Sequence, residues 1–131
     1  MITASRDSGR PTLLLVDDDD SIRNDYMLQI GEKFQIIPFA DYASTMSYLS
    51  GHKPDVVLSD IDLTGDGSGR QGVNICDFAR KNYGIPAFLM SSDYSMRSIA
   101  ERNGLKFHLK GVESVADLVE RISNAIGYHS N

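Results

Sequence analysis

The sequence predicts an α/β fold, a doubly wound (βα)5 domain built on a five-stranded parallel sheet. Three observations favour it: short apolar runs alternate along the chain with helical patterns, the runs have the length of buried strands, and they end in polar residues. Parallel strands need right-handed crossover helices, which cover both faces of the sheet. Ligands bind to such open sheets along the edge formed by the carboxyl ends of the strands.

The first half of the chain predicts three strands and two helices. The strand runs cover residues 13–16, 34–39 and 55–59. The first helix follows Asp19 or Asp20, either of which can cap its N-terminus, and has apolar residues at four-residue spacing. Asp41 can cap the second helix, which stops at Gly51. Pro38 cannot donate a ladder hydrogen bond, so the second strand is expected at an edge of the sheet.

The second half predicts two strands and three helices. Residues 63–72 contain four glycines and have the composition of a loop. Helices are expected over 73–83, 94–103 and 115–126, and strands over 87–90 and 105–109. Ser114 can cap the last helix, whose apolar residues form a single stripe.

Length and composition predict one soluble domain. Of the 131 residues, 1–10 are expected to form a flexible leader and 11–131 the domain. Lys and Arg total 13 and Asp and Glu total 18, and this net charge of -5 disfavours nucleic acid or an anionic membrane as a partner. Cys76 is the only cysteine, which excludes an internal disulfide. Since no apolar run is long enough to span a membrane, a cytoplasmic location is expected.

Polar residues at the strand ends form the candidate site. The first run ends in four acids, Asp17 to Asp20, and the third ends in Asp60, with Asp62 two residues later. Ser91 and Lys110 end the fourth and fifth runs. Clustered acids with one lysine and one hydroxyl suit a divalent cation that holds a phosphoryl group.

This arrangement resembles the receiver domain of two-component response regulators over roughly residues 11–128. The family's acid pair, phospho-accepting aspartate, hydroxyl and lysine fall on Asp17 and Asp18, Asp60, Ser91 and Lys110. The resemblance implies the CheY-like strand order 2-1-3-4-5. It also implies that Asp60 takes a phosphoryl group from a phosphohistidine on a sensor kinase or phosphotransfer protein. Such a domain catalyses its own phosphorylation and dephosphorylation, and it controls a downstream protein or output domain.

The resemblance also implies a metal site. Mg²⁺, with Mn²⁺ as the alternative, would be bound directly by Asp18 and Asp60, through water by Asp17, and by the backbone carbonyl of Asp62. Lys110 would pair with one phosphoryl oxygen, and Ser91 would donate a hydrogen bond to another. The apolar run ends at Val16, which favours Asp17 and Asp18 as the acid pair, but a shift by one residue stays open.

Two further roles follow from matched positions. Phe107, three residues before Lys110, corresponds to the family's aromatic switch residue, which moves together with the hydroxyl of Ser91. Asp62 and Asp93 would flank the path of the water that hydrolyses the acyl phosphate. An acid there can orient or partly deprotonate this water, so we expect Asp93→Ala to slow autodephosphorylation.

The sequence departs from the family pattern at two loops. Thr64 stands where proline is frequent, and Gly65–Gly69 has the appearance of an insertion beside the site. Gly111 follows Lys110 where many receivers have proline. A cis peptide bond before a residue other than proline costs about 2.5–4 kcal/mol, so a trans Lys110–Gly111 bond is expected.

Rival interpretations are weaker. The segment Asp60–Thr64 fits the DxDxT signature of haloacid-dehalogenase-type phosphatases, but that family places its further acid pair after the lysine, whereas Asp17 and Asp18 come before it. A calcium loop starting at Asp60 would end at Gln71 instead of a bidentate glutamate. A degenerate receiver that acts as a phosphorylation-independent interaction module stays open. His52, His108 and His129 lack metal-ligand spacing and are expected to be surface or packing residues.

Overall fold

The computed structural model describes residues 2–3, 9–63 and 69–128. Its main sheet has five parallel strands in the order β3-β2-β5-β6-β7. The strands are β2 (Thr12–Val16), β3 (Gln35–Phe39), β5 (Val56–Asp60), β6 (Ala87–Ser91) and β7 (Lys106–Leu109). Counted along the chain, this order is 2-1-3-4-5, so the predicted fold class and strand order are confirmed. Pro38 lies on the edge strand β3, as expected.

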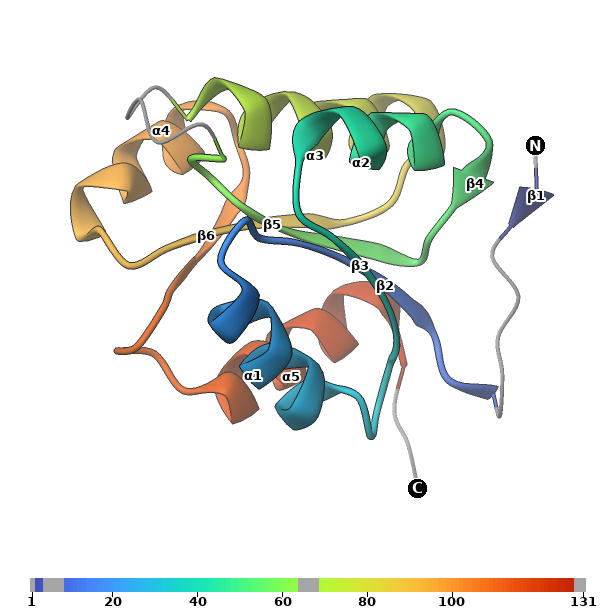
Figure 1. Cartoon of the computed structure of the whole chain (residues 1–131), viewed down its shortest axis with the longest axis horizontal. Coiled ribbons are helices and arrows are strands. Elements are labelled where there is room, and N and C mark those ends of the chain that lie inside the picture. Colours follow the sequence, from blue (N-terminus) through green and yellow to red (C-terminus); the bar gives the residue numbers. More distant parts are fainter. Residues whose placement is uncertain (1, 4–8, 64–68, 129–131) are drawn as a thin grey trace.

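Helices cover both faces of the sheet (Figure 1). They are α1 (Asp20–Ile30), α2 (Tyr42–Leu49), α3 (Arg70–Tyr83), α4 (Arg97–Arg102) and α5 (Val115–Ile126). One face carries α2, α3 and α4, and the other carries α1 and α5. The helix predicted over 94–103 is divided into a 3₁₀ helix, Tyr94–Met96, followed directly by α4.

Side-chain caps set the start of three helices. Asp19 accepts a hydrogen bond from the backbone N–H of Ile22, which identifies Asp19, and not Asp20, as the cap of α1. Asp41 and Ser114 cap α2 and α5 in the same way, as predicted. Each cap satisfies a backbone donor that the helix itself leaves without a partner.

The start of α3 differs from the prediction. The helix begins at Arg70 after Gly69, so residues 70–72 are helical and do not belong to the glycine-rich loop. Gly72 packs against the end of β5: a Cβ atom there would lie 2.5 Å from the carbonyl oxygen of Asp60. The missing side chain therefore lets α3 approach the backbone that carries Asp60. Apart from Gly69, the predicted insertion lies outside the described residues, as does Thr64.

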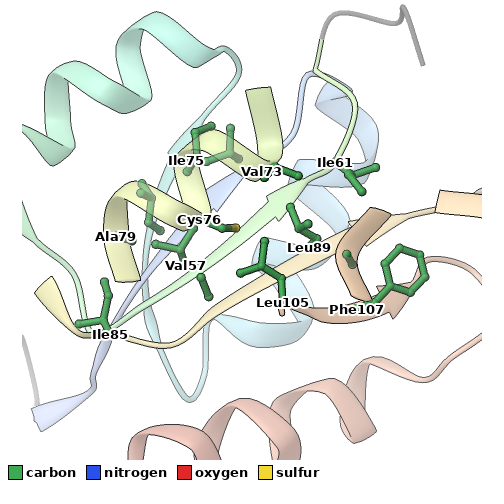
Figure 2. Close-up of a cluster of buried hydrophobic side chains, with 14 of the residues drawn as sticks. Val57, Ile61, Val73, Ile75, Cys76, Ala79, Ile85, Leu89, Leu105 and Phe107 are labelled. Carbon is green, nitrogen blue, oxygen red and sulfur yellow. The ribbon is translucent and has the colours of Figure 1, made fainter. Parts of the chain in front are cut away.

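Each face of the sheet has its own apolar core. Figure 2 shows the cluster between the sheet and α2–α4, which includes Val57, Leu89 and Phe107. Cys76 is fully buried in this cluster, and burial raises the pKa of its thiol. Such an environment is typical of an inert structural thiol. The second cluster lies under α1 and α5 and includes Leu13, Phe34 and Met90.

A second, small sheet is separate from the main sheet. The two-residue strands β1 (Ile2–Thr3) and β4 (His52–Lys53) pair in parallel. Residues 4–8 lie outside the described part, and the flexible leader over 1–10 stays a prediction. Within the described ranges, none of the helices has both the length and the apolar character needed to cross a membrane.

Candidate functional site

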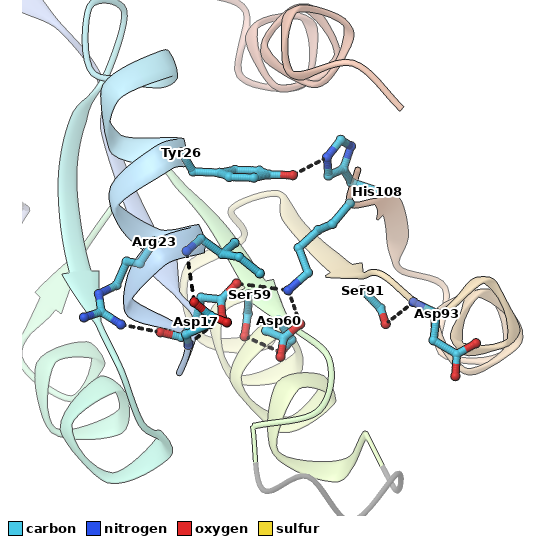
Figure 3. Close-up of polar contacts among 11 residues, drawn as sticks. Asp17, Arg23, Tyr26, Ser59, Asp60, Ser91, Asp93 and His108 are labelled. Atoms are coloured by element: carbon cyan, nitrogen blue, oxygen red, sulfur yellow. Dashed lines mark hydrogen bonds and ion pairs between the residues drawn. The ribbon is translucent and has the colours of Figure 1, made fainter. Parts of the chain in front are cut away.

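Three predicted site residues meet at the carboxyl edge of the sheet. Asp17 follows β2, Asp60 ends β5 and Lys110 follows β7. Figure 3 shows Asp17 and Asp60 at this edge. The Nζ atom of Lys110 lies 3.0 Å from Oδ2 of Asp17 and 3.0 Å from Oδ1 of Asp60. Lys110 thus forms one ion-paired cluster with Asp17 and Asp60, which precede it by 93 and 50 residues in the sequence. The parallel sheet explains this meeting, since it aligns the carboxyl ends of its strands at one edge.

The Lys110–Gly111 step leaves the side chain of Lys110 within reach of the site. The Lys110–Gly111 peptide bond is trans, as predicted, and Gly111 has a φ of +80°. The backbone N–H of Lys110 donates to the carbonyl of Ser91 at 2.8 Å, so β7 stays in register with β6 up to the lysine. Lys110 reaches both carboxylates without a proline after it.

Asp60 lies in an unfavourable environment for a carboxylate. It is 8% exposed, and burial raises its pKa from 3.8 to about 6. The ammonium of Lys110 opposes this shift, while the charges of Asp17 and Asp18 add to it. Burial lowers the pKa of Lys110, but the two carboxylates outweigh that effect and the pKa is raised, which keeps the lysine charged.

The acids form a donor set for a divalent cation. Asp17, Asp18 and Asp60 each offer a carboxylate oxygen, and these oxygens all lie within 4.8 Å of one another. Two of the residues are buried and Asp18 is exposed, so the cluster opens to solvent on one side. Hard carboxylate oxygens beside free coordination positions suit Mg²⁺, which retains water ligands.

The other two acids of the run are engaged elsewhere. Asp19 caps α1, and Asp20 forms a surface ion pair with Arg23. Asp17 is held in place by its own neighbours: its Oδ1 accepts from the N–H of Asp19 at 2.9 Å, and its carbonyl accepts from Nη1 of Arg23 at 2.7 Å. These contacts favour Asp17 and Asp18 as the acid pair.

Ser91 ends β6 on the same edge, and its side chain faces a local partner. Its Oγ accepts a hydrogen bond from the N–H of Asp93 at 3.0 Å. The carboxylate of Asp93 accepts from the N–H and the hydroxyl of Ser95, and these hydrogen bonds lower its pKa. In Figure 3 the carboxylate of Asp93 points away from Asp60. Asp62 is half-buried in the segment that follows β5.

Phe107 points into the core and has a charged neighbour that the sequence did not reveal. The residue is buried, and the guanidinium of Arg97 lies 5.1 Å from the centre of its ring. Arg97 also approaches Glu113 at 3.7 Å, and Glu113 accepts a hydrogen bond from the N–H of Leu109 at 2.6 Å. The position of the aromatic ring is therefore linked to α4 and to the loop before α5.

His108 is a packing residue, one of the two expected alternatives, and it has a polar partner that the sequence did not reveal. It is completely buried, and its Nε2 lies 2.8 Å from the hydroxyl of Tyr26 on α1. The histidine between the apolar residues Phe107 and Leu109 was the available signal. His52 is exposed and stacks on Tyr48, and His129 lies outside the described residues.

Comparison with known proteins identifies the fold. No protein-family model and no curated protein matches the sequence. Among solved structures, a response regulator receiver protein from Sinorhizobium medicae aligns with a TM-score of 0.77 and 21% identity over 91% of this chain and 96% of that chain. A two-component response regulator from Clostridium difficile gives 0.74 and 19% over 90% and 97%.

A CheY-like receiver domain protein from Methanospirillum hungatei gives a TM-score of 0.72 and 18% identity over 91% and 95% of the two chains. The chain has the CheY-like fold of response-regulator receiver domains.

Proposed function

We propose that this chain is a phospho-accepting receiver of a two-component or phosphorelay system, with Asp60 as the acceptor. The observation that carries the proposal is the contact of Lys110 with both Asp17 and Asp60, beside Asp18, at the carboxyl edge of a receiver fold. The donor is a phosphohistidine of a sensor kinase or phosphotransfer protein in the cytoplasm. The phosphorylated domain then acts on a downstream protein or output domain.

The transfer is a displacement at phosphorus. A carboxylate oxygen of Asp60 forms a bond to phosphorus while the bond between phosphorus and the imidazole nitrogen of the donor breaks, so an acyl phosphate and a free histidine result. Lys110, already within hydrogen-bond distance of Asp60, is placed to pair with a phosphoryl oxygen. Ser91 would turn its hydroxyl from the N–H of Asp93 to another phosphoryl oxygen. Water later hydrolyses the acyl phosphate.

A divalent cation fits this donor set. Asp18 and Asp60 would bind it directly, Asp17 through water, and the carbonyl of Asp62 would complete the protein ligands. When bound, Mg²⁺ or Mn²⁺ supplies positive charge that keeps the clustered acids ionised and neutralises the incoming phosphoryl oxygens. Burial raises the pKa of Asp60 to about 6, and a bound cation would lower it and so favour the ionised carboxylate.

The rival functions fit the arrangement less well. In a haloacid-dehalogenase-type phosphatase the residue at Asp62 would act as general acid and base, and the further acid pair would follow the lysine. Here Asp17 follows β2, the first strand of the main sheet along the chain, and Lys110 follows β7, the last, so the acid comes before the lysine. A degenerate receiver would have no need for an ion-paired Lys110, Asp17 and Asp60.

Phosphorylation with a small donor tests the proposal. Incubated with acetyl phosphate and Mg²⁺, the protein should gain the mass of one phosphoryl group, and chelation of the metal should prevent the gain. Asp60→Asn should gain none, while the matched control Asp25→Asn, on the exposed face of α1, should be modified like the wild type. Unchanged phosphorylation of Asp60→Asn would contradict the assignment, and steady turnover of a small phosphomonoester would favour the phosphatase.

A further inference from the structure

Tyr26 and His108 form a buried polar pair between α1 and β7. Tyr26 is 5% exposed and His108 is 0% exposed. The Tyr26 hydroxyl lies 2.8 Å from Nε2 of His108, and the rings meet edge to face with their centres 5.9 Å apart (Figure 3). Apolar residues that include Leu13, Phe88 and Leu118 form the cluster around the pair, and the guanidinium of Arg121 lies 5.6 Å from the centre of the Phe88 ring.

Stability alone does not explain this pair. Within the described residues, Nδ1 of His108 is buried without a hydrogen-bond partner, and a buried polar atom left unpaired costs free energy. Burial lowers the pKa of His108 and raises that of Tyr26 to about 12, so both groups are neutral near pH 7. Two apolar side chains of similar shape would fill the same space without the unpaired nitrogen.

The pair closes a ring of contacts that includes the candidate site. Arg23 on α1 donates to the carbonyl of Asp17, and Tyr26 lies one turn further along the same helix. His108 precedes Lys110 by two residues, and Lys110 returns to Asp17 through its ion pair at 3.0 Å. The segment that carries Lys110 is thus tied to the β2–α1 region twice, once at the site and once in the core.

The tie in the core matters because β7 is an edge strand. It pairs only with β6 in the main sheet. Beyond Lys110 the chain passes to exposed Gly111, and the turn that follows bonds back to Leu109 and not to the β2–α1 region. When Lys110 turns from Asp17 to a phosphoryl oxygen, the tie at the site is lost, whereas the hydrogen bond in the core is not.

We propose that Tyr26 and His108 are positioning residues that hold β7 against α1 and so keep Lys110 within reach of Asp60 and its phosphoryl group. This inference rests on the proposed role of Asp60 as phosphoryl acceptor. It adds two residues that do not contact the reacting atoms.

The first test compares the rate of phosphorylation with the stability of the fold. The double variant Tyr26→Phe/His108→Leu removes both polar partners, so its midpoint of urea unfolding should stay near that of the wild type. Its phosphorylation by acetyl phosphate and Mg²⁺ should slow about tenfold, since a displacement of a reacting group by about 1 Å can cost about 10²-fold. Tyr48→Phe is the matched control, because its hydroxyl is buried and unpaired among the described residues; its rate should not change.

The second test asks whether the effect passes through Lys110. In a Lys110→Met background, the same double substitution should slow phosphorylation no further. An equal slowing in both backgrounds would indicate a general structural defect and overturn the proposal, as would a wild-type rate in the double variant itself.

A third measurement does not depend on phosphorylation. The coupling between Lys110→Met and Asp60→Asn in urea unfolding should be strong in the wild type and largely lost with Tyr26→Phe/His108→Leu. If the wild type accepts no phosphoryl group, the proposed function fails, and this coupling decides whether the pair positions Lys110. Coupling of unchanged strength would overturn the positioning role.

Discussion

The two halves of the sheet edge hold their polar side chains in different ways. In the acceptor half, the nearly buried Lys110 contacts Asp17 and Asp60, which lie 93 and 50 residues before it in the sequence. In the hydroxyl half, the Ser91 side chain bonds to the backbone of Asp93, and Asp93 bonds to Ser95, each only two residues away. The first set is therefore fixed by tertiary structure, whereas the second can rearrange within one turn of chain. This division suits a site in which the charges are preorganised and the hydroxyl moves.

The largest difference between the halves is expected in stability. Lys110→Met removes the ammonium group that pairs with two buried carboxylates. Loss of one partner of a buried ion pair lowers the free energy of unfolding by about 3–5 kcal/mol. Ser91→Ala removes one hydrogen bond, worth about 0.5–1.5 kcal/mol. Urea unfolding without divalent cations measures both. Because Mg²⁺ would supply the missing charge, adding it should recover part of the loss in Lys110→Met. Equal losses in the two variants would remove the distinction between the halves.

The second prediction concerns pH. The folded pKa of Asp60, about 6, lies above its ordinary value of 3.8, so the folded state binds more protons between these values. Asp60 therefore makes stability fall as pH rises from about 4 to 6. Asp60→Asn lacks this loss and, without metal, should exceed the wild type by up to about 3 kcal/mol at pH 7 and by little at pH 4.

Unfolding curves across this pH range, in the presence of a chelator, check the prediction. Asp25→Asn is again the control and should keep the pH dependence of the wild type. If the free energy of unfolding differs between Asp60→Asn and the wild type by the same amount at all pH values, the pKa of Asp60 is not raised in the folded state.

Much of this arrangement was predictable from local patterns. The caps Asp41 and Ser114 follow from short-range signals, and the strand order follows from the resemblance to receiver domains. The meeting of Asp60 and Lys110 follows from the geometry of a parallel sheet. The start of α3 was missed because glycines on both sides of Arg70 favour a loop, while close packing of Gly72 on β5 stabilises the helix.

Contacts between segments far apart in the sequence could not be predicted, because they depend on tertiary structure and not on a local pattern. The partner of His108 lies 82 residues earlier in the sequence, and the ring contact of Arg97 with Phe107 joins α4 to β7. No periodicity in one segment specifies which side chain another segment will bring against it.

The third prediction tests the register of the acid pair within the acceptor half. Asp18→Ala should weaken Mg²⁺ binding about tenfold or more, equivalent to about 1.4 kcal/mol, and slow phosphorylation. Asp20→Ala removes a surface ion pair with Arg23, worth about 0.3–0.5 kcal/mol, and should leave Mg²⁺ binding unchanged. Titration calorimetry with MgCl₂ measures both affinities. The reverse result would show that Asp17 and Asp18 are not the acid pair.

The smallest effect is expected in the hydroxyl half, at Asp93. Two opposing influences act on the hydrolysing water: a nearby carboxylate can orient it or accept its proton, but its negative charge also repels a hydroxide-like nucleophile. Hydrogen bonds from Ser95 lower the pKa of Asp93 and so make it a weaker base, and its carboxylate points away from Asp60. Asp93 can then still contribute by orienting the water, after a modest rearrangement of its side chain.

We therefore expect Asp93→Ala to slow autodephosphorylation by a small factor, well below the effects of Asp60 and Lys110 on phosphorylation. The measurement loads the protein, removes the donor and follows the decay of the acyl phosphate. Asp93→Asn is the informative companion, because an amide can still accept the hydrogen bonds from Ser95 while the charge is gone. If Asp93→Asn decays like the wild type and Asp93→Ala more slowly, the contribution is positional. If both decay faster than the wild type, repulsion by the charge dominates and Asp93 protects the phosphoryl group.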